Sequence, residues 1–352
     1  MAWTYEDIIE DYNSLCTMYH DENNKDIKQN ILNTLYGVKK YIMPDNTKDN
    51  IDDSIDNIYD NLFKYRQIYP VLERYYDLVN KTGFRFGHYI KRDIGIDIKL
   101  EDAYELLHEF FKSCGKEIFH YYTILEKQRD TYLDFSNMGQ NYKGFIIPFP
   151  ILEKVYINVH LNDNGVKGCL ESLAHEYGHG IISLMNKNRY FSKNSFYEIE
   201  SYFFELIGLD YFYNETKDSF YINDLYNLSH AESINVHNIL SRKNAAEEAM
   251  LSGRNYDKIK NKCKKEIQEN GTDFNRYPSY FSNDIRYSYS FLCAVELFEL
   301  YKQDKDLAIN ALINIVTKNA TNMEEELEII NKQITPVKSM VKHLDRIKHV
   351  TK

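Results

Sequence analysis

Proline and glycine are scarce in this chain, with six and fourteen residues respectively among 352. Turn-rich all-β architectures use both residue types heavily, so their scarcity argues against such a fold. Long stretches that contain Lys, Glu, Leu, Ile and Tyr dominate the sequence instead, and this composition favours helix. We therefore expect a mainly α protein, built as one large helical body or as two lobes that share a cleft.

Cysteine is also rare, and its five residues are odd in number, far apart and free of any CxxC pair. Neither a disulfide framework nor a cysteine zinc knuckle is indicated by this pattern. We expect reduced thiols in a cytoplasmic protein. The five residues are Cys16, Cys114, Cys169, Cys263 and Cys293.

Positive charge is in deficit, since the net charge is −10. A nucleic-acid footprint needs a concentrated basic face, so we expect no nucleic-acid partner. No uninterrupted apolar stretch approaches the length of a membrane span, and the N-terminal MAWTYEDIIEDYNSLC lacks a basic start followed by an apolar run. We therefore expect neither membrane insertion nor an export signal.

Apolar spacing along the chain predicts a series of helices interrupted by one β region. The helices are expected at about 5–42, 55–82, 100–130, 166–187, 195–214, 230–250 and 284–303, with a final pair between 305 and 350. The first two are expected to form an N-terminal hairpin, separated by an acidic loop. A segment rich in β-branched and aromatic residues predicts two short strands, at about 143–148 and 154–161.

The C-terminal stretch is basic and amphipathic, so a helix that binds a membrane surface or a partner is one interpretation. The interpretation we favour is a terminal helix that docks an apolar stripe on the core. That stripe comprises Val337, Met340, Val341, Leu344 and Ile347.

The stretch SLAHEYGHGIISLM, residues 172–185, contains an HExxH motif. On a helix, His175 and His179 are near neighbours on one face, close enough for both imidazoles to bind one metal ion. Glu176 lies one residue further round, where it can accept a proton from water on the open side of the ion. The motif predicts a catalytic metal site. The alternative is a polar cluster in a core helix with a structural role only.

A third ligand is needed, because a catalytic zinc ion usually has three from the protein. The three-histidine pattern would need glycine at position 182 and histidine at position 185, but Ile182 and Met185 stand there. A glutamate from the following helix is the other solution. Glu198 and Glu205 share a helical face, so we choose Glu198 as the ligand, with Glu200 as the alternative. Glu205 is expected to orient a histidine N–H.

The chain resembles the thimet oligopeptidase and oligoendopeptidase F family of zinc metallopeptidases. AHEYGHG followed by ExxSxxxE (Glu198, Ser201, Glu205) looks like the zinc signature of that family. The segment from DTYLDFSNMGQNYKGFIIPFP to the motif helix is similar to the family's strand region, and RYPSYFSNDIRYSYSFLCAVELFELY to its tyrosine-rich segment. The resemblance covers roughly residues 95–300.

The resemblance implies a zincin-type helical metallopeptidase with a small β-sheet beside the active-site helix and a deep substrate channel. One zinc ion per chain would be held by His175, His179 and Glu198, with Glu176 as general base. A tyrosine would hydrogen-bond the oxyanion of the transition state. Tyr289 is the best match for that tyrosine, with Tyr287 and Tyr280 as reserves.

The chain is about half as long as typical family members. We therefore expect residues 1–92 to form a truncated N-terminal helical lobe and residues 93–352 to form the catalytic domain. The expected function is zinc-dependent endopeptidase cleavage of oligopeptides. The alternatives are a dedicated processing peptidase for one precursor and a catalytically weak, metal-containing peptide-binding protein. A shortened channel would be more open, or be completed by a second copy of the chain or another partner.

Overall fold

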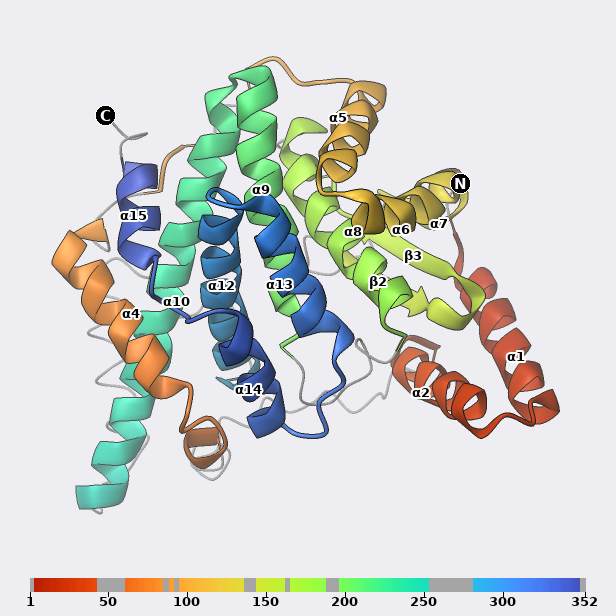
Figure 1. Cartoon of the computed structure of the whole chain (residues 1–352), viewed down its shortest axis with the longest axis horizontal. Helices are drawn as coiled ribbons and strands as arrows, with labels where there is room; N and C mark the ends of the chain where they lie inside the picture. The colour runs from red at the N-terminus through yellow and green to blue at the C-terminus, as the bar shows by residue number, and fades with distance from the viewer. Residues whose placement is uncertain are drawn as a thin grey trace.

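The computed structural model describes residues 3–42, 61–84, 89–91, 95–135, 144–161, 165–187, 196–252 and 281–348. In these ranges the protein is mostly helical, and one small three-stranded sheet lies toward one side of the molecule (Figure 1). The expected mainly α fold, with a small sheet beside the HExxH helix, is confirmed.

The described elements follow one another along the chain in two groups. The first group consists of α1 (Tyr5–Asp21), α2 (Lys25–Ile42), α4 (Tyr69–Thr82), α5 (Leu100–Ser113), α6 (Lys116–Lys127), α7 (Arg129–Tyr132), β1 (Leu133–Asp134), β2 (Gly144–Phe149) and β3 (Lys154–Val159). The second group consists of α8 (Leu170–Met185), α9 (Glu198–Thr216), α10 (Ser219–Ser252), α12 (Phe281–Tyr301), α13 (Lys305–Thr317), α14 (Met323–Gln333) and α15 (Met340–Lys348).

The N-terminal hairpin differs from the one expected. The predicted helix 5–42 is two helices, α1 and α2, which pack against each other. Glu22 ends α1 in an extended conformation, and the Asn24 side chain accepts the N–H of Asp26 at the start of α2. Three polar residues break the helix here without disturbing the apolar spacing.

The predicted pairing of residues 5–42 with residues 55–82 is wrong, because α4 packs against α10 and α15. The boundary at residue 92 stays a prediction.

The predicted helix 100–130 is also divided, into α5, α6 and the short α7. Gly115 separates α5 from α6 with a φ of 109°, a conformation that other residues rarely adopt. The helix expected at 230–250 is longer than predicted, because α10 begins at Ser219.

The sheet has the strand order β1-β3-β2, with β3 in the centre. Strand β2 runs antiparallel to β3, from the pair Gly144 and Val159 to the pair Phe149 and Lys154. One sheet face packs on α8, and α1 and α2 cover the other (Figure 1). Trp3 fixes this cover, because its indole N–H donates to the Ile157 carbonyl at 3.2 Å. Because the described strands are ordered β1-β3-β2, β1 and β2 lie at the two edges of the sheet, and each has one edge that pairs with no other described strand.

The C-terminal helix α15 docks on the core beside α4, α10 and α12 (Figure 1). The predicted apolar stripe is confirmed at Val337, Met340, Leu344 and Ile347, which are all buried. Val341 is the exception, because it is 41% exposed. The helix is shorter than the predicted stripe, since Val337 lies before its first turn.

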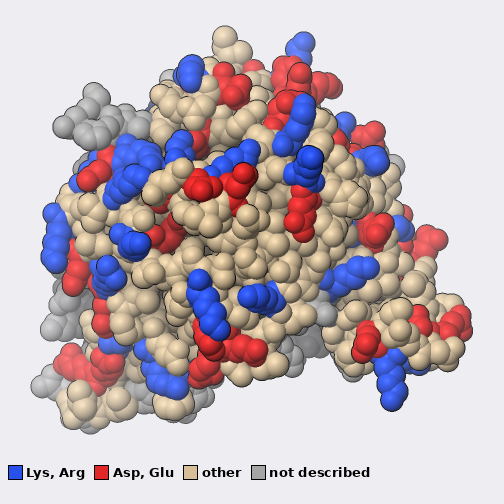
Figure 2. Space-filling model, in the orientation of Figure 1, with Lys and Arg blue, Asp and Glu red and all other residues tan. Residues whose placement is uncertain are grey.

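Charged residues make up 27% of the sequence, and many of them lie on the surface. On the face that Figure 2 shows, acidic and basic side chains are interspersed over the helices. Within the described ranges, every helix is too short or too polar to traverse a lipid bilayer. The four described cysteines, which form no disulfide bond with one another, are Cys16, Cys114, Cys169 and Cys293.

Candidate metal centre

Helix α8 carries the HExxH motif through the middle of the protein, and nearly all its residues are buried. Because it is covered on every side, its own side chains set how closely its neighbours approach. A β-carbon on Gly178 would lie 2.7 Å from the Phe204 ring of α9. The glycine between the two histidines therefore lets α9 pack closely against α8, where α9 can supply a third ligand.

Helix α9 begins at Glu198, so that carboxylate sits in the first turn, where the helix dipole favours negative charge. The Ser201 hydroxyl, one turn on, donates to Glu198 Oε2 at 3.0 Å. This hydrogen bond fixes one oxygen of the carboxylate. Glu198 is consequently a buried, oriented anion that faces α8.

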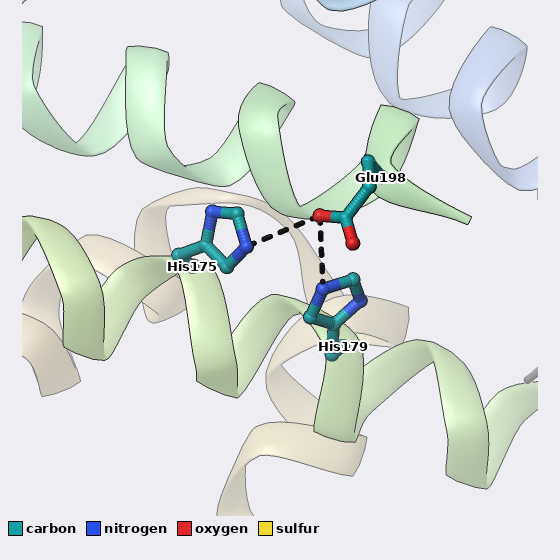
Figure 3. A group of neighbouring side chains, drawn as sticks. All are labelled: His175, His179 and Glu198. Carbon is teal, nitrogen blue, oxygen red and sulfur yellow. Dashed lines mark ion pairs between the residues drawn. The ribbon is translucent and has the colours of Figure 1, made fainter. Parts of the chain in front are cut away.

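Three donor atoms meet between these helices. Oε2 of Glu198 lies 3.3 Å from Nε2 of His175 and 3.3 Å from Nε2 of His179 (Figure 3). Four donors at about 2.0 to 2.1 Å from a tetrahedral zinc ion are separated from one another by roughly 3.3 to 3.4 Å. The donors of all three residues lie within 4.8 Å of one another. Their spacing and chemistry thus fit one zinc ion, and Glu198 rather than Glu200 completes the group.

Glu205 supports the first histidine from behind. Its Oε2 lies 2.9 Å from His175 Nδ1. The other ring nitrogen of His175, Nε2, is the one that faces Glu198. A carboxylate there accepts the Nδ1 proton and leaves Nε2 as the metal-binding atom. The structure thus places Glu205 where the sequence predicted an acceptor for a histidine N–H.

The charges of His175, His179 and Glu198 interact, and the interaction shifts the pKa values of Glu198 and His175. Burial opposes ionisation of Glu198, but the two imidazoles outweigh it and lower the pKa of that carboxyl well below its ordinary value. Burial also disfavours a charged His175, yet hydrogen bonds to Glu198 and Glu205 outweigh it and raise the pKa of the imidazole. The fold therefore concentrates negative charge where a cation would be held.

Glu176 lies beside the group without joining it. Its residue is 6% exposed, and its carboxylate approaches Gly144 at the start of β2. Burial raises the pKa of Glu176, although the neighbouring imidazoles of His175 and His179 oppose the rise. A carboxylate with a raised pKa, next to a metal site, suits proton transfer better than an ordinary one.

The two predicted tyrosines of α12 take different positions. The Glu198 carboxylate is the main cause of a raised pKa of Tyr287, whose side chain also hydrogen-bonds Tyr197. Tyr289 is 1% exposed, packs on Phe196 with ring centroids 4.8 Å apart and hydrogen-bonds Cys293. Residues two positions apart on an α-helix are about 200° apart around its axis, so Tyr287 and Tyr289 point to nearly opposite sides of α12. The structure brings Tyr287 to the metal centre and Tyr289 into the core, whereas Tyr280 lies outside the described residues.

Sequence reasoning missed two further tyrosines near the histidines. Tyr197 directly precedes Glu198, and its ring centroid lies 6.1 Å from that of His179. Tyr202 packs edge-on against His175 at 5.5 Å. Tyr202 follows Glu198 by four residues, so helical spacing alone would have placed it on the ligand's face.

The fold is similar to that of several solved structures. A Bacillus anthracis protein described provisionally as an oligoendopeptidase F matches 93% of this chain with a TM-score of 0.53 and 14% identity. A second structure, with the same provisional description, matches 91% with a TM-score of 0.56 and 12% identity. A Pz peptidase A solved with an inhibitor matches 89% with a TM-score of 0.52 and 11% identity.

At these identities the likeness concerns the fold, and at that level the predicted resemblance to the oligopeptidase family is confirmed. This chain spans 63%, 64% and 60% of the lengths of the three matched chains. No protein-family model and no curated protein sequence matches it.

Proposed function

We propose that the protein is a zinc-dependent endopeptidase that hydrolyses oligopeptides. The observation that carries this proposal is the meeting of His175, His179 and Glu198 at zinc-ligand spacing, with the buried carboxylate of Glu176 beside them. The likeness to peptidase folds supports it, because the group is built on a scaffold of that kind. Such an arrangement is suited to hydrolysis at a metal-activated carbonyl.

In this proposal each residue has a separate role. Zinc, when bound by the two Nε2 atoms and the Glu198 carboxylate, would polarise the scissile carbonyl and acidify water. Glu176 accepts the proton of the attacking water and passes it to the leaving amine. The Tyr287 hydroxyl, whose ring centroid lies 6.4 Å from that of Tyr197, donates a hydrogen bond to the developing oxyanion.

The substrate backbone is expected to pair with β2. Strand β3 is the central strand of the described sheet, with β1 and β2 on its two sides, so it cannot accept a peptide as a further strand. Strand β2 is one of the two edge strands of the described sheet, the other being β1, and its first residue lies against Glu176. Backbone pairing there would hold a peptide with little dependence on its side chains.

The wider predictions belong to the same proposal. A second copy of the chain or another partner that completes the substrate channel is part of the same proposal. We also propose a cytoplasmic location, which the free thiols of the described cysteines support.

The test is cleavage of a mixed peptide library, read by mass spectrometry, with zinc-loaded wild type and Glu176→Gln. We expect wild type to cut many peptides internally and the variant to cut at least roughly 100-fold more slowly, as loss of a general base predicts. Cleavage of one sequence would favour the dedicated processing peptidase. Binding without cleavage would favour the peptide-binding protein, and equal cleavage by both proteins would refute the proposal.

A further inference from the structure

The first residue of β2, Gly144, lies in direct contact with the Glu176 carboxylate. A β-carbon built on Gly144 would lie 2.7 Å from Glu176 Oε1 and 2.9 Å from Glu176 Cγ. Non-bonded carbon atoms prefer separations of roughly 3.5 to 4.0 Å, and oxygen comes only slightly closer. The glycine therefore occupies a place where no other residue fits without movement.

Backbone conformation does not explain this glycine. The described glycines with positive φ are Gly83, Gly95, Gly115 and Gly165, and Gly144 is not among them. It pairs with Val159 in an ordinary antiparallel ladder, where glycine is unfavourable relative to residues with side chains. Close approach of another group is the usual reason for glycine within a strand, and here that group is Glu176.

The strand cannot easily retreat from an added methyl group. A β-carbon at position 144 would also lie 2.9 Å from the Asn158 carbonyl oxygen of β3. Strand β3 is held in turn by Trp3, which donates to Ile157, and by the Asn158 side chain, which donates to Asp134 at 3.1 Å. The Glu176 side chain is the movable partner, because it can rotate while the backbone of α8 stays packed.

We propose that Gly144 is a positioning residue for Glu176. Because glycine has no side chain, the Glu176 carboxylate can occupy the space next to β2 and lie beside the candidate metal centre. This inference rests on the proposed peptidase function for its catalytic consequence, but the contact itself does not. A displacement of about 1 Å in a reacting group can cost roughly 100-fold in rate. Any side chain at position 144 is therefore expected to impair proton transfer while leaving all three metal ligands in place.

The kinetic test compares Gly144→Ala with Ile31→Ala. Ile31 of α2 is buried in the cluster that covers the other face of the sheet, so its truncation loosens the packing on β2 without changing that strand or the space of Glu176. We expect Gly144→Ala to lower kcat roughly 10- to 100-fold, with KM and bound zinc nearly unchanged. Ile31→Ala is expected to lower the unfolding temperature and leave kcat within about 3-fold of wild type, since it removes core packing only.

A stability test gives a readout that needs neither zinc nor activity. Gly144→Ala is made in the wild-type and Glu176→Ala backgrounds, and the unfolding temperature of each metal-free protein is measured. We expect the alanine to lower this temperature in the wild-type background and to lower it much less where Glu176 has been truncated, because the main obstructing atoms are gone.

An equal loss of unfolding temperature in both backgrounds would overturn the proposal, since the strain would then lie in the strand. An unchanged kcat in Gly144→Ala would overturn it as well. If wild type cleaves no peptide, the peptidase function fails, but the stability comparison still decides whether Gly144 makes room for Glu176.

Discussion

Tyr287 and Tyr289 are two positions apart on α12, but their surroundings differ. Tyr287 lies near Glu198 and hydrogen-bonds Tyr197, whereas Tyr289 is enclosed with Phe196 and Cys293. The similarity of the sequence to a tyrosine-rich segment could not separate them. Which of two nearby tyrosines faces the candidate metal ligands depends on how α12 is rotated against α9, and that rotation is set by tertiary packing.

Removing the two hydroxyls separately tests this assignment. We expect Tyr287→Phe to lower kcat roughly 100- to 1,000-fold, as loss of one oxyanion donor does in other enzymes. Tyr289→Phe should leave kcat within a few-fold, because its hydroxyl bonds a core cysteine. Steady-state kinetics on a peptide substrate decides the matter, and a larger loss in Tyr289→Phe would reverse the assignment.

Glu232 is a buried acid that the proposed mechanism does not use. It is 4% exposed on α10, and its Oε1 has no hydrogen-bond partner among the described residues. Burial raises its pKa to about 7, and Asp284 adds to the rise, although hydrogen bonds from Ser288 and Asn235 oppose it. At neutral pH this side chain is therefore only partly ionised.

The sign of the pH effect follows from that raised pKa. The folded protein holds the proton more tightly than the unfolded chain, so the stability that the proton provides is complete below pH 4.5 and is lost as the pH rises through about 7. Glu232→Gln removes this dependence. Its free energy of unfolding, relative to wild type, should increase by about 3 kcal/mol between pH 4.5 and pH 8.5.

Urea unfolding of the metal-free proteins at several pH values measures this difference. In the absence of metal, titration of the zinc ligands affects both proteins alike and cancels. A difference that stays constant with pH would show that Glu232 ionises normally in the folded protein.

At the scale of elements, close packing of α8 against α9 brings the three candidate metal ligands together. The HExxH motif and the apolar spacing predicted both helices, and the shared face of Glu198 and Glu205 identified the group that the structure brings to the histidines. The breaks at residues 22–24 and at Gly115 were not predictable in the same way, because a few polar residues or one glycine leave the apolar period intact.

The C-terminal helix is attached by a buried ion pair. Glu299 of α12 is completely buried, and the Arg346 guanidinium of α15 binds both its oxygens, at 2.6 and 3.0 Å. Lys342 lies 3.4 Å from the same carboxylate. Burial opposes ionisation of Glu299, but the neighbouring His343 imidazole and the Arg346 charge outweigh that and lower its pKa.

Breaking this pair should loosen α15. We expect Arg346→Met to reduce the free energy of unfolding by roughly 3 kcal/mol, because a buried carboxylate loses its bidentate partner while Lys342 remains. Lys332→Met is the matched control, since its ion pair with Glu328 is exposed and should contribute less than about 0.5 kcal/mol. Because the pKa of Glu299 is lowered, the Arg346→Met effect should persist above pH 4.5 and fade as the pH falls. Denaturant unfolding would contradict this if both variants lost the same amount.

At the scale of the whole molecule, the arrangement follows from contacts that no local pattern contains. Trp3 reaches the Ile157 carbonyl, and α4 packs against α10 and α15, so the N-terminal segments cover two separate parts of the structure. Composition and periodicity predicted the fold class and most helices. They could not predict which helices pair, because apolar stripes specify that a face is buried but not against what.

The zinc affinity of the intact protein tests the central claim, that His175, His179 and Glu198 together form one zinc site. Competition with a chromophoric chelator should give one zinc ion per wild-type chain. His179→Ala should weaken binding by more than the roughly 10- to 100-fold expected for loss of an outer partner, whereas Glu200→Ala should bind nearly as wild type does. A wild-type protein that binds no zinc, or a His179→Ala protein that binds it equally well, would contradict the claim.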